Sequence, residues 1–185
     1  WPTHERQAYR YFVGNGIPKL VERLAPADQR TPAVLEAALA DFKRDYGQHL
    51  RDTTAPYPGI PEMLAKLKAN GVQLAVFSNK ADALAKEVVK DYFGTQYFTI
   101  VRGQMTGVAP KPAAEGTNAL LQALHADPAS TLYVGDSNVD VETAHNANLP
   151  CCGAVWGFRT REELNAAGAE YLAENSDELY DVIMK

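Results

Sequence analysis

The chain has 185 residues, of which 46% are hydrophobic, and a formal net charge of −5 at pH 7; this fits an ordinary globular protein with one sizeable core. The negative charge argues against non-specific nucleic-acid binding, no segment approaches the roughly 20 apolar residues of a membrane helix, and the first residues are too polar for a signal peptide. We therefore expect a small-molecule partner, no nucleic-acid or membrane partner, and a cytoplasmic location, with monomer and homodimer both open.

The first 54 residues show helical patterns and no convincing strand. Helices are predicted over residues 3–13, 17–24 and 31–46. Pro18 stands in the first turn of the second helix, where proline is favoured, and Thr31 is a good N-cap for the third. Gly47 is expected to end that third helix. Residues 1–54 are thus predicted to form a small all-helical domain.

From residue 55 onward, apolar strand patterns alternate with helical patterns. Helices are expected over residues 57–71, 81–93, 111–125, 139–148, 160–168 and 176–184. Strands are expected over residues 72–79, 98–103, 131–136 and 151–157. Alternation of this kind predicts βαβ units with right-handed crossovers, and the continuously apolar strands fit a parallel sheet covered on both faces. The predicted fold class is α/β, with a Rossmann-like core over residues 55–185.

Polar residues follow three of the predicted strands. Ser78 and Asn79 come after the first, Lys111 follows the second and its loop, and Asp136 and Asp140 come after the third. Since ligands of open α/β sheets bind beyond the carboxyl ends of the strands, these side chains are expected to converge. Taken singly, each group has a commoner interpretation: a turn, a solvated lysine and a helix cap.

Together, these side chains have the chemistry that a phosphate ester with Mg²⁺ requires. A hydroxyl, an amide and a cation suit phosphoryl oxygens, and carboxylates suit a hard, oxygen-seeking cation. The metal would also offset the cost of placing two carboxylates together at the mouth of a buried strand.

The ordered motifs resemble those of a known superfamily. Ser78-Asn79, Lys111-Pro112 and the segment GDSNVD at residues 135–140 look like motifs II, III and IV of the haloacid dehalogenase superfamily. Within it, YFVGNGIPKLVERL, YPGIPEMLAKLKANG and VGDSNVDVETAHNANLP are similar to phosphoglycolate phosphatases. In those enzymes a helical cap closes over the active site of a Rossmann-like core, so the resemblance implies that residues 1–54 are the cap.

The resemblance implies a role for each motif residue. Ser78 and Lys111 would be catalytic: Ser78, with the Asn79 backbone, would bind the phosphoryl group, and Lys111 would neutralise that group and the nucleophile. Asp136 would coordinate Mg²⁺, with Asp140 as a second ligand or directly behind the first.

The cap loop would face the non-phosphate end of the substrate, which the resemblance implies for Gly14, Asn15 and Gly16. Glycines permit close backbone approach and positive φ there. A plain helix-to-helix turn is the alternative interpretation.

The function implied by the resemblance is Mg²⁺-dependent hydrolysis of a small, phosphoglycolate-like monoester through an aspartyl-phosphate. The family's nucleophile stands in a DxDGT-type motif on the first core strand, and no such motif occurs in residues 1–185; the family pattern would place it before Trp1. We therefore expect the 185-residue chain to be inactive without that strand. Two alternatives stay open: a sugar-phosphate phosphatase, mutase or pyrophosphatase of the same superfamily, and a non-catalytic phosphate-binding or interaction protein.

Other residues receive plainer predictions. Cys151 and Cys152 are adjacent, so we expect small buried hydrophobes rather than a disulfide or a metal site. Lys80 is expected to be a solvated lysine at a helix start. Packing at the end of the last strand is expected for Trp156, Phe158 and Arg159.

Overall fold

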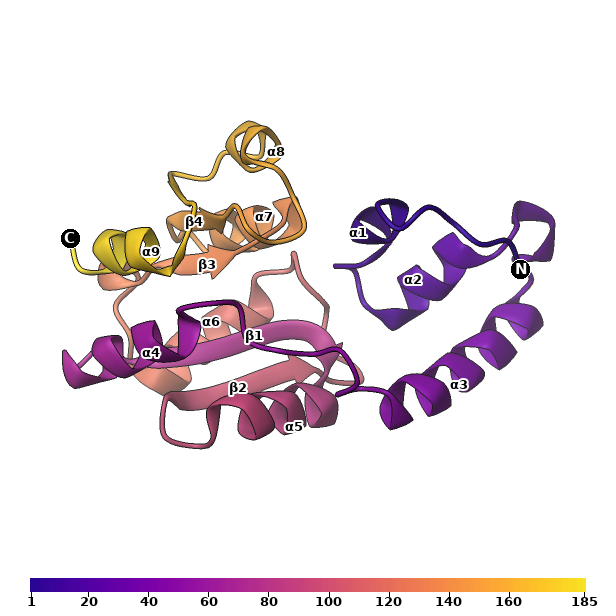
Figure 1. The fold of residues 1–185 in the computed structure, drawn as a ribbon, viewed down its shortest axis with the longest axis horizontal. Coiled ribbons are helices and arrows are strands. Elements are labelled where there is room, and N and C mark those ends of the chain that lie inside the picture. Colours follow the sequence, from indigo (N-terminus) through magenta and orange to yellow (C-terminus); the bar gives the residue numbers. More distant parts are fainter.

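A computed structural model describes all 185 residues as a helical unit beside an α/β core (Figure 1). The helical unit contains α1 (Ala8–Phe12), α2 (Ile17–Leu24), the 3₁₀ turn η1 (Ala27–Gln29) and α3 (Pro32–Gln48). Thr31 caps α3, since its side chain accepts from Val34 N at 3.5 Å. None of the helices in the chain combines the length and apolarity needed to cross a membrane.

Two helix boundaries in this unit differ from the predictions. The first helix covers Ala8–Phe12 rather than residues 3–13, because no side chain caps its N-terminus and its first turn lacks that stabilisation. The third helix runs through Gly47 to Gln48 instead of ending at the glycine. A glycine whose backbone N–H stays in the helical ladder weakens a helix without ending it.

The core alternates strands and helices. Its elements are α4 (Ile60–Ala69), β1 (Leu74–Ala81), α5 (Asp82–Phe93), β2 (Phe98–Gln104), α6 (Glu115–Leu124), η2 (Pro128–Ser130), β3 (Tyr133–Gly135), α7 (Asn138–Asn146), β4 (Cys151–Ala154), α8 (Arg161–Ala166), β5 (Tyr171–Ala173) and α9 (Ser176–Ile183). All strand pairs are parallel, with β1 beside β2 and β4 between β3 and β5. The predicted α/β fold class with a parallel sheet is confirmed.

Two core elements differ from the predictions by more than a shift of a few residues at their ends or raise a physical question. Strand β5 was not predicted; it has three residues and is held by pairing with β4 rather than by any pattern of its own. Helix α6 begins at Glu115 instead of Lys111. A residue that precedes proline is disfavoured in helical conformation, and the Lys111 N–H donates instead to Asn79 Oδ1.

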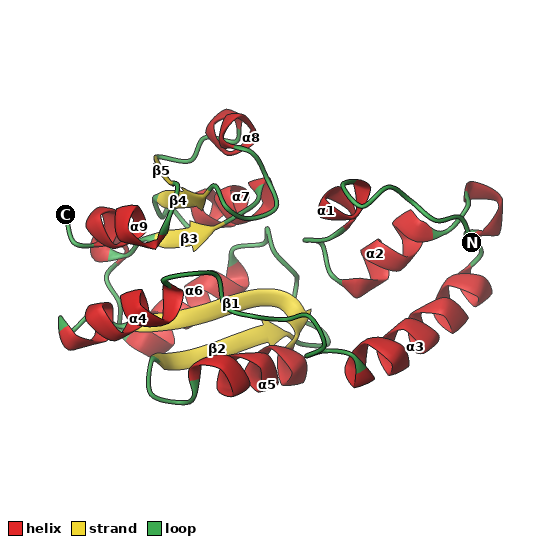
Figure 2. Ribbon diagram, in the orientation of Figure 1, coloured by secondary structure: helices red, strands yellow, loops and turns green.

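The strands form two separate sheets rather than one. Strands β1 and β3 are not paired with each other, so each has an edge without backbone partners (Figure 2). Between them lies a groove of about 860 Å³. Its lining is mostly hydrophobic and comes from β1, β3 and the helices around them, including Leu74, Phe77, Leu120, Leu132 and Val134. An exposed apolar edge of this kind favours pairing with a further strand.

The buried core has two hydrophobic clusters, one on each side of β4. Cys151 belongs to the cluster around α7 and α8, and Cys152 belongs to the one around α4 and α9. Both thiols are fully buried and free, and burial raises their pKa to about 12 for Cys151 and about 11 for Cys152. The prediction of small buried hydrophobes is therefore confirmed. The two side chains lie in different clusters because neighbouring residues on a strand face opposite sides.

Candidate functional site

A cavity of about 240 Å³ lies where the helical unit meets the core. Its walls come from the loop after α1, the loop before α6, the turn into α7 and the segment after β4, and consist of Val13, Gly14, Lys111, Gly135, Asp136, Ser137, Asp140, Ala154, Phe158 and Arg159. Four of the residues predicted for the site therefore meet at one cavity: Gly14, Lys111, Asp136 and Asp140.

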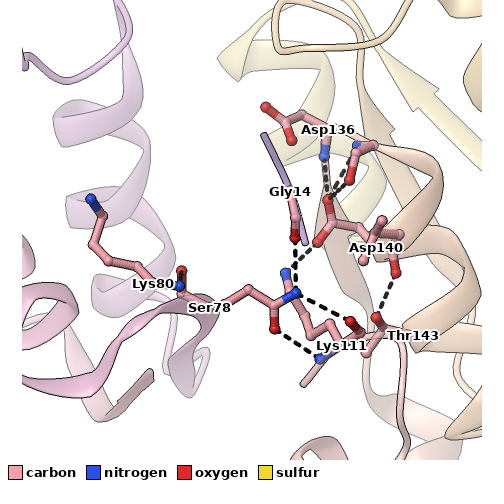
Figure 3. A network of polar contacts seen from close by, with 10 residues as sticks. Gly14, Ser78, Lys80, Lys111, Asp136, Asp140 and Thr143 are labelled. Carbon is pink, nitrogen blue, oxygen red and sulfur yellow. Dashed lines mark hydrogen bonds and ion pairs between the residues drawn. The ribbon is translucent and has the colours of Figure 1, made fainter. Parts of the chain in front are cut away.

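Lys111 and Asp140 form a buried ion pair in this cavity (Figure 3). Lys111 Nζ lies 2.6 Å from Asp140 Oδ1, and the two side chains are 11% and 10% exposed. Burial by itself would lower the pKa of Lys111, but the neighbouring Asp140 carboxylate outweighs burial and raises it above its ordinary value. Lys111 therefore remains a cation throughout the neutral range.

Asp140 also takes part in the N-terminal cap of α7, as the third residue of that helix. Its Oδ2 accepts from Asp136 N at 3.2 Å, Ser137 N at 3.2 Å and Ser137 Oγ at 2.6 Å. Ser137 and Asp140 form the reciprocal capping box of α7, a pattern that their spacing of three residues encodes. Both carboxylate oxygens of Asp140 are thus engaged within the protein.

Asp136 presents the freer carboxylate. Figure 3 shows its carboxylate turned away from the Asp140 side chain. Its Oδ2 accepts from Phe158 N at 3.2 Å, and its backbone carbonyl accepts from Arg159 N at 3.1 Å. Burial, followed by the charge of Asp140, raises the pKa of Asp136, so ionising this group in the folded protein is costly.

The carboxylate oxygens of Asp136 and Asp140 suit a hard cation that takes few ligands from the protein. Nowhere in the chain do three His, Cys, Asp or Glu side chains gather to hold a metal. Mg²⁺ commonly keeps several waters and binds one or two carboxylates together with substrate phosphates. Asp136 meets that requirement, and Asp140 lies directly behind it, so the residues fit the ion.

Asn79 joins three parts of the site through one side chain. Its Oδ1 accepts from Lys111 N at 2.8 Å, and its Nδ2 donates to Lys111 O at 3.2 Å and to Gly14 O at 2.8 Å. The residue is 9% exposed. The side chain of Asn79 therefore positions the lysine loop and the loop after α1 on the end of β1.

Ser78 does not line the cavity. Its Oγ accepts from Lys80 N at 3.1 Å, a local side-chain-to-backbone turn. Asn15 also lies outside the cavity wall, because its Oδ1 accepts from Arg23 Nη2 at 2.9 Å. Gly14 and Gly16 have φ values of 111° and 85°, which favour glycine.

The structure adds residues to the site that the sequence analysis assigned elsewhere. Phe158 and Arg159 line the cavity instead of only packing at the end of β4. Arg159 Nη1 donates to Arg10 O at 2.6 Å, and its guanidinium lies 4.7 Å from the centre of the Tyr11 ring. The rule that led to Lys111, that ligands gather at carboxyl ends of strands, applies equally to the segment after β4.

Lys80 makes a further contact between the helical unit and the core. Its Nζ hydrogen-bonds the Tyr46 hydroxyl and lies 4.5 Å from the centre of that ring. The expected solvated role is therefore wrong. The lysine stem and the aromatic ring bring the end of α3 against the end of β1.

Known proteins of one family are similar to this chain. A family model described as haloacid dehalogenase-like hydrolase matches residues 2–154. The phosphoglycolate phosphatase of Mesorhizobium japonicum is 30% identical over 159 residues, which cover 85% of this chain and 70% of the relative. That of Neisseria meningitidis is 33% identical over 150 residues, with 80% of this chain and 64% of the relative covered. The chain thus spans about two thirds of the length of these relatives.

A solved structure has the same fold. The crystal structure of a protein from Lactobacillus delbrueckii subsp. bulgaricus superposes with a TM-score of 0.91 and 26% identity. The match covers 97% of this chain and 83% of that chain. Both the helical unit and the core therefore have counterparts in that protein.

Proposed function

This chain belongs to the haloacid dehalogenase-like hydrolases and is of the phosphoglycolate phosphatase type, and from that premise we propose that its site serves Mg²⁺-dependent hydrolysis of a small, phosphoglycolate-like phosphate monoester. Residues 1–54 act as the cap in this proposal and residues 55–185 as the core. The substrate lies in the cavity between them.

The proposal rests chiefly on the Lys111 ammonium, which neighbouring side chains hold in place in the cavity. Lys111 offers a permanently charged ammonium with three donors, which suits the oxygens of a phosphoryl group. Asp140 holds the ammonium from one side and Asn79 holds the backbone, so the charge stays in place before substrate arrives. A preorganised charge of this kind stabilises the transition state of phosphoryl transfer without reorganisation.

In the same proposal Asp136 holds Mg²⁺ through its carboxylate, and Asp140 supports the site from behind. When bound, the ion supplies positive charge to the phosphoryl oxygens and orients them. The cation would also offset the cost of ionising the buried Asp136. The Ser78 hydroxyl accepts from Lys80 N and keeps its own hydrogen free to donate, but it would have to turn into the cavity to contact the phosphoryl group.

The covalent step of the family mechanism needs a free carboxylate that the cavity does not offer. Asp136 and Asp140 are the only carboxylates in its wall; Asp140 is paired with Lys111, and this proposal assigns Asp136 to Mg²⁺. We propose that the nucleophile is an aspartate on an additional strand between β1 and β3. Its oxygen would attack phosphorus and displace the alcohol, and water would then hydrolyse the aspartyl-phosphate.

Turnover of p-nitrophenyl phosphate with Mg²⁺ tests this proposal. Two proteins are compared: residues 1–185, and the same chain extended at its N-terminus by an apolar strand ending in Asp-x-Asp. Only the extended protein is expected to be active, and changing the first aspartate of the added motif to asparagine should abolish its turnover. Robust turnover by residues 1–185 would contradict the nucleophile assignment.

A non-catalytic phosphate-binding protein is the second candidate, and the missing free carboxylate favours it. If the extended protein folds and binds inorganic phosphate but hydrolyses neither p-nitrophenyl phosphate nor other small esters, the phosphatase proposal is wrong and this second function stands.

A further inference from the structure

Arg159 is a buried arginine in the wall of the cavity. The residue is 9% exposed, and its backbone N–H donates to the carbonyl of Asp136 at 3.1 Å. The segment after β4 therefore fixes the start of this side chain beside the proposed metal ligand.

The guanidinium of Arg159 has only neutral partners. It donates to the carbonyl of Arg10 and stacks on the ring of Tyr11, and no carboxylate lies within salt-bridge distance of it. Arg161, two residues further on, pairs with Glu174 at 2.5 Å although it is 47% exposed. Asp136 and Glu163 lie close enough to interact with the charge of Arg159, but neither forms a salt bridge with it. Burying a cation without a directly paired carboxylate is costly, so an anion that enters the cavity would gain by pairing with Arg159.

Lys111 and Arg159 offer two cations of different shape to one small ligand. The Lys111 ammonium is already neutralised by Asp140, and the proposed function assigns it to the phosphoryl group. Arg159 remains for another anionic group. A planar guanidinium fork matches the two oxygens of a carboxylate, whereas an ammonium acts as a point charge.

The contacts of Arg159 also connect a ligand to the cap. Both neutral partners lie on α1, and Arg10 Nη2 donates in return to the carbonyl of Gly157. The segment 157–159 and α1 therefore exchange hydrogen bonds in both directions. A carboxylate bound by Arg159 would lie at the seam where the cap closes on the core.

We propose that Arg159 binds a carboxylate of the substrate and so selects small phosphate esters that carry one. This inference rests on the proposed phosphatase function, because Lys111 must take the phosphoryl group. It assigns a specificity-determining role to a residue of the chain outside the three sequence motifs.

Isothermal titration of residues 1–185 in the presence of Mg²⁺ tests the assignment, with 2-phosphoglycolate and ethyl phosphate as ligands. The two differ in the carboxylate alone among charged groups. The wild-type chain should prefer 2-phosphoglycolate by about tenfold, the factor that a charge-assisted hydrogen bond supplies. Arg159→Gln should remove this preference and leave the affinity for ethyl phosphate unchanged, and Arg159→Lys should retain part of it.

Arg161→Gln is the matched control, since that arginine is exposed and pairs with Glu174 outside the cavity. It should keep the wild-type preference. If Arg159→Gln keeps the preference, or weakens both ligands equally, Arg159 only holds the cap and the assignment is wrong while the phosphate site stands. If the wild-type chain binds neither ligand, the proposed phosphate site itself fails, and this inference fails with it.

Discussion

The side-chain amide of Asn79 brackets the backbone of Lys111. Its Oδ1 accepts from Lys111 N at 2.8 Å, and its Nδ2 donates to Lys111 O at 3.2 Å. The same Nδ2 donates to the Gly14 carbonyl at 2.8 Å, so the amide also ties the loop after α1 to the lysine loop. An amide suits this position because it carries an acceptor and two donors on one short side chain.

Asn79→Ala should lower the free energy of unfolding by about 3 kcal/mol, because it removes three hydrogen bonds of about 1 kcal/mol each. Asn79→Asp keeps the acceptor for Lys111 N but turns a carboxylate oxygen toward the Lys111 and Gly14 carbonyls, so it should cost at least as much as the alanine variant. Urea unfolding followed by circular dichroism measures both. Asn138→Ala is the control, since Asn138 makes an exposed hydrogen bond to Glu142. An equal loss of unfolding free energy in both alanine variants would show that the three hydrogen bonds of Asn79 stabilise the fold no more than an exposed bond does.

The sequence predicts that the motif side chains converge because a rule of topology applies to it. Parallel strands bring their carboxyl ends to one edge, so Lys111, Asp136 and Asp140 meet without any knowledge of side-chain directions. It could not predict where a side chain turns after the strand ends. Ser78 bonds the backbone two residues on, and Arg159 turns toward α1, because local hydrogen bonds and cap contacts decide between near-equal orientations.

The parts of the fold that were mispredicted depend on tertiary contacts. Strand β5 has three residues, too few to show a period, and exists because β4 offers it a partner. The loop at Lys111 has a helical sequence pattern, but Asn79 takes its backbone N–H and a proline follows it. In both places a neighbour distant in the sequence overrides the local pattern.

Gly135→Ala should destabilise the chain by about 3 kcal/mol through overpacking. A Cβ at Gly135 would lie 2.1 Å from Asp140 Cβ, and Asp140 cannot yield without breaking its bonds to Ser137 and Lys111. Thermal unfolding measures the change. Gly47→Ala is the matched control: nothing lies within 4 Å of its added Cβ, and the substitution in α3 should stabilise by about 0.5–1 kcal/mol. Tolerance of Gly135→Ala would show that the end of β3 can move away from α7.

Asp136→Asn should make the chain more stable at neutral pH in the absence of divalent cations. Burial raises the pKa of Asp136 in the folded protein above its value in the unfolded chain. The folded protein therefore gains stability from the protonated carboxyl at a pH below the unfolded pKa, and it loses that stability as the pH rises through the folded pKa. The asparagine cannot ionise and avoids that loss. The advantage of the variant over wild type should therefore be absent in acid and grow toward pH 7.

Added Mg²⁺ should reverse this order. At about a hundredfold excess over its dissociation constant, a ligand stabilises the folded state by about 2.7 kcal/mol, and only the wild type retains the proposed ligand. Thermal unfolding with and without MgCl₂ measures the difference. Asp28→Asn, at an exposed position in η1, should keep the wild-type response. An identical response to Mg²⁺ in Asp136→Asn would refute Asp136 as a ligand.

Val134→Lys should reduce self-association of the chain. Val134 is 39% exposed on β3, whose free edge borders the apolar groove between the two sheets. Unpaired edges with apolar side chains favour pairing between copies, and a lysine on an edge strand opposes it. Sedimentation velocity over a range of protein concentrations measures the association, and binding of a hydrophobic dye reports the groove.

Val34→Lys is the matched control, because Val34 is 37% exposed on α3 and does not line the groove. It adds the same charge and should leave association and dye binding near wild type. The chain extended by an apolar strand should behave like Val134→Lys, since the added strand would pair with both free edges. Equal association in the two lysine variants would show that copies meet elsewhere, and dye binding that persists in the extended chain would show that the strand does not enter the groove.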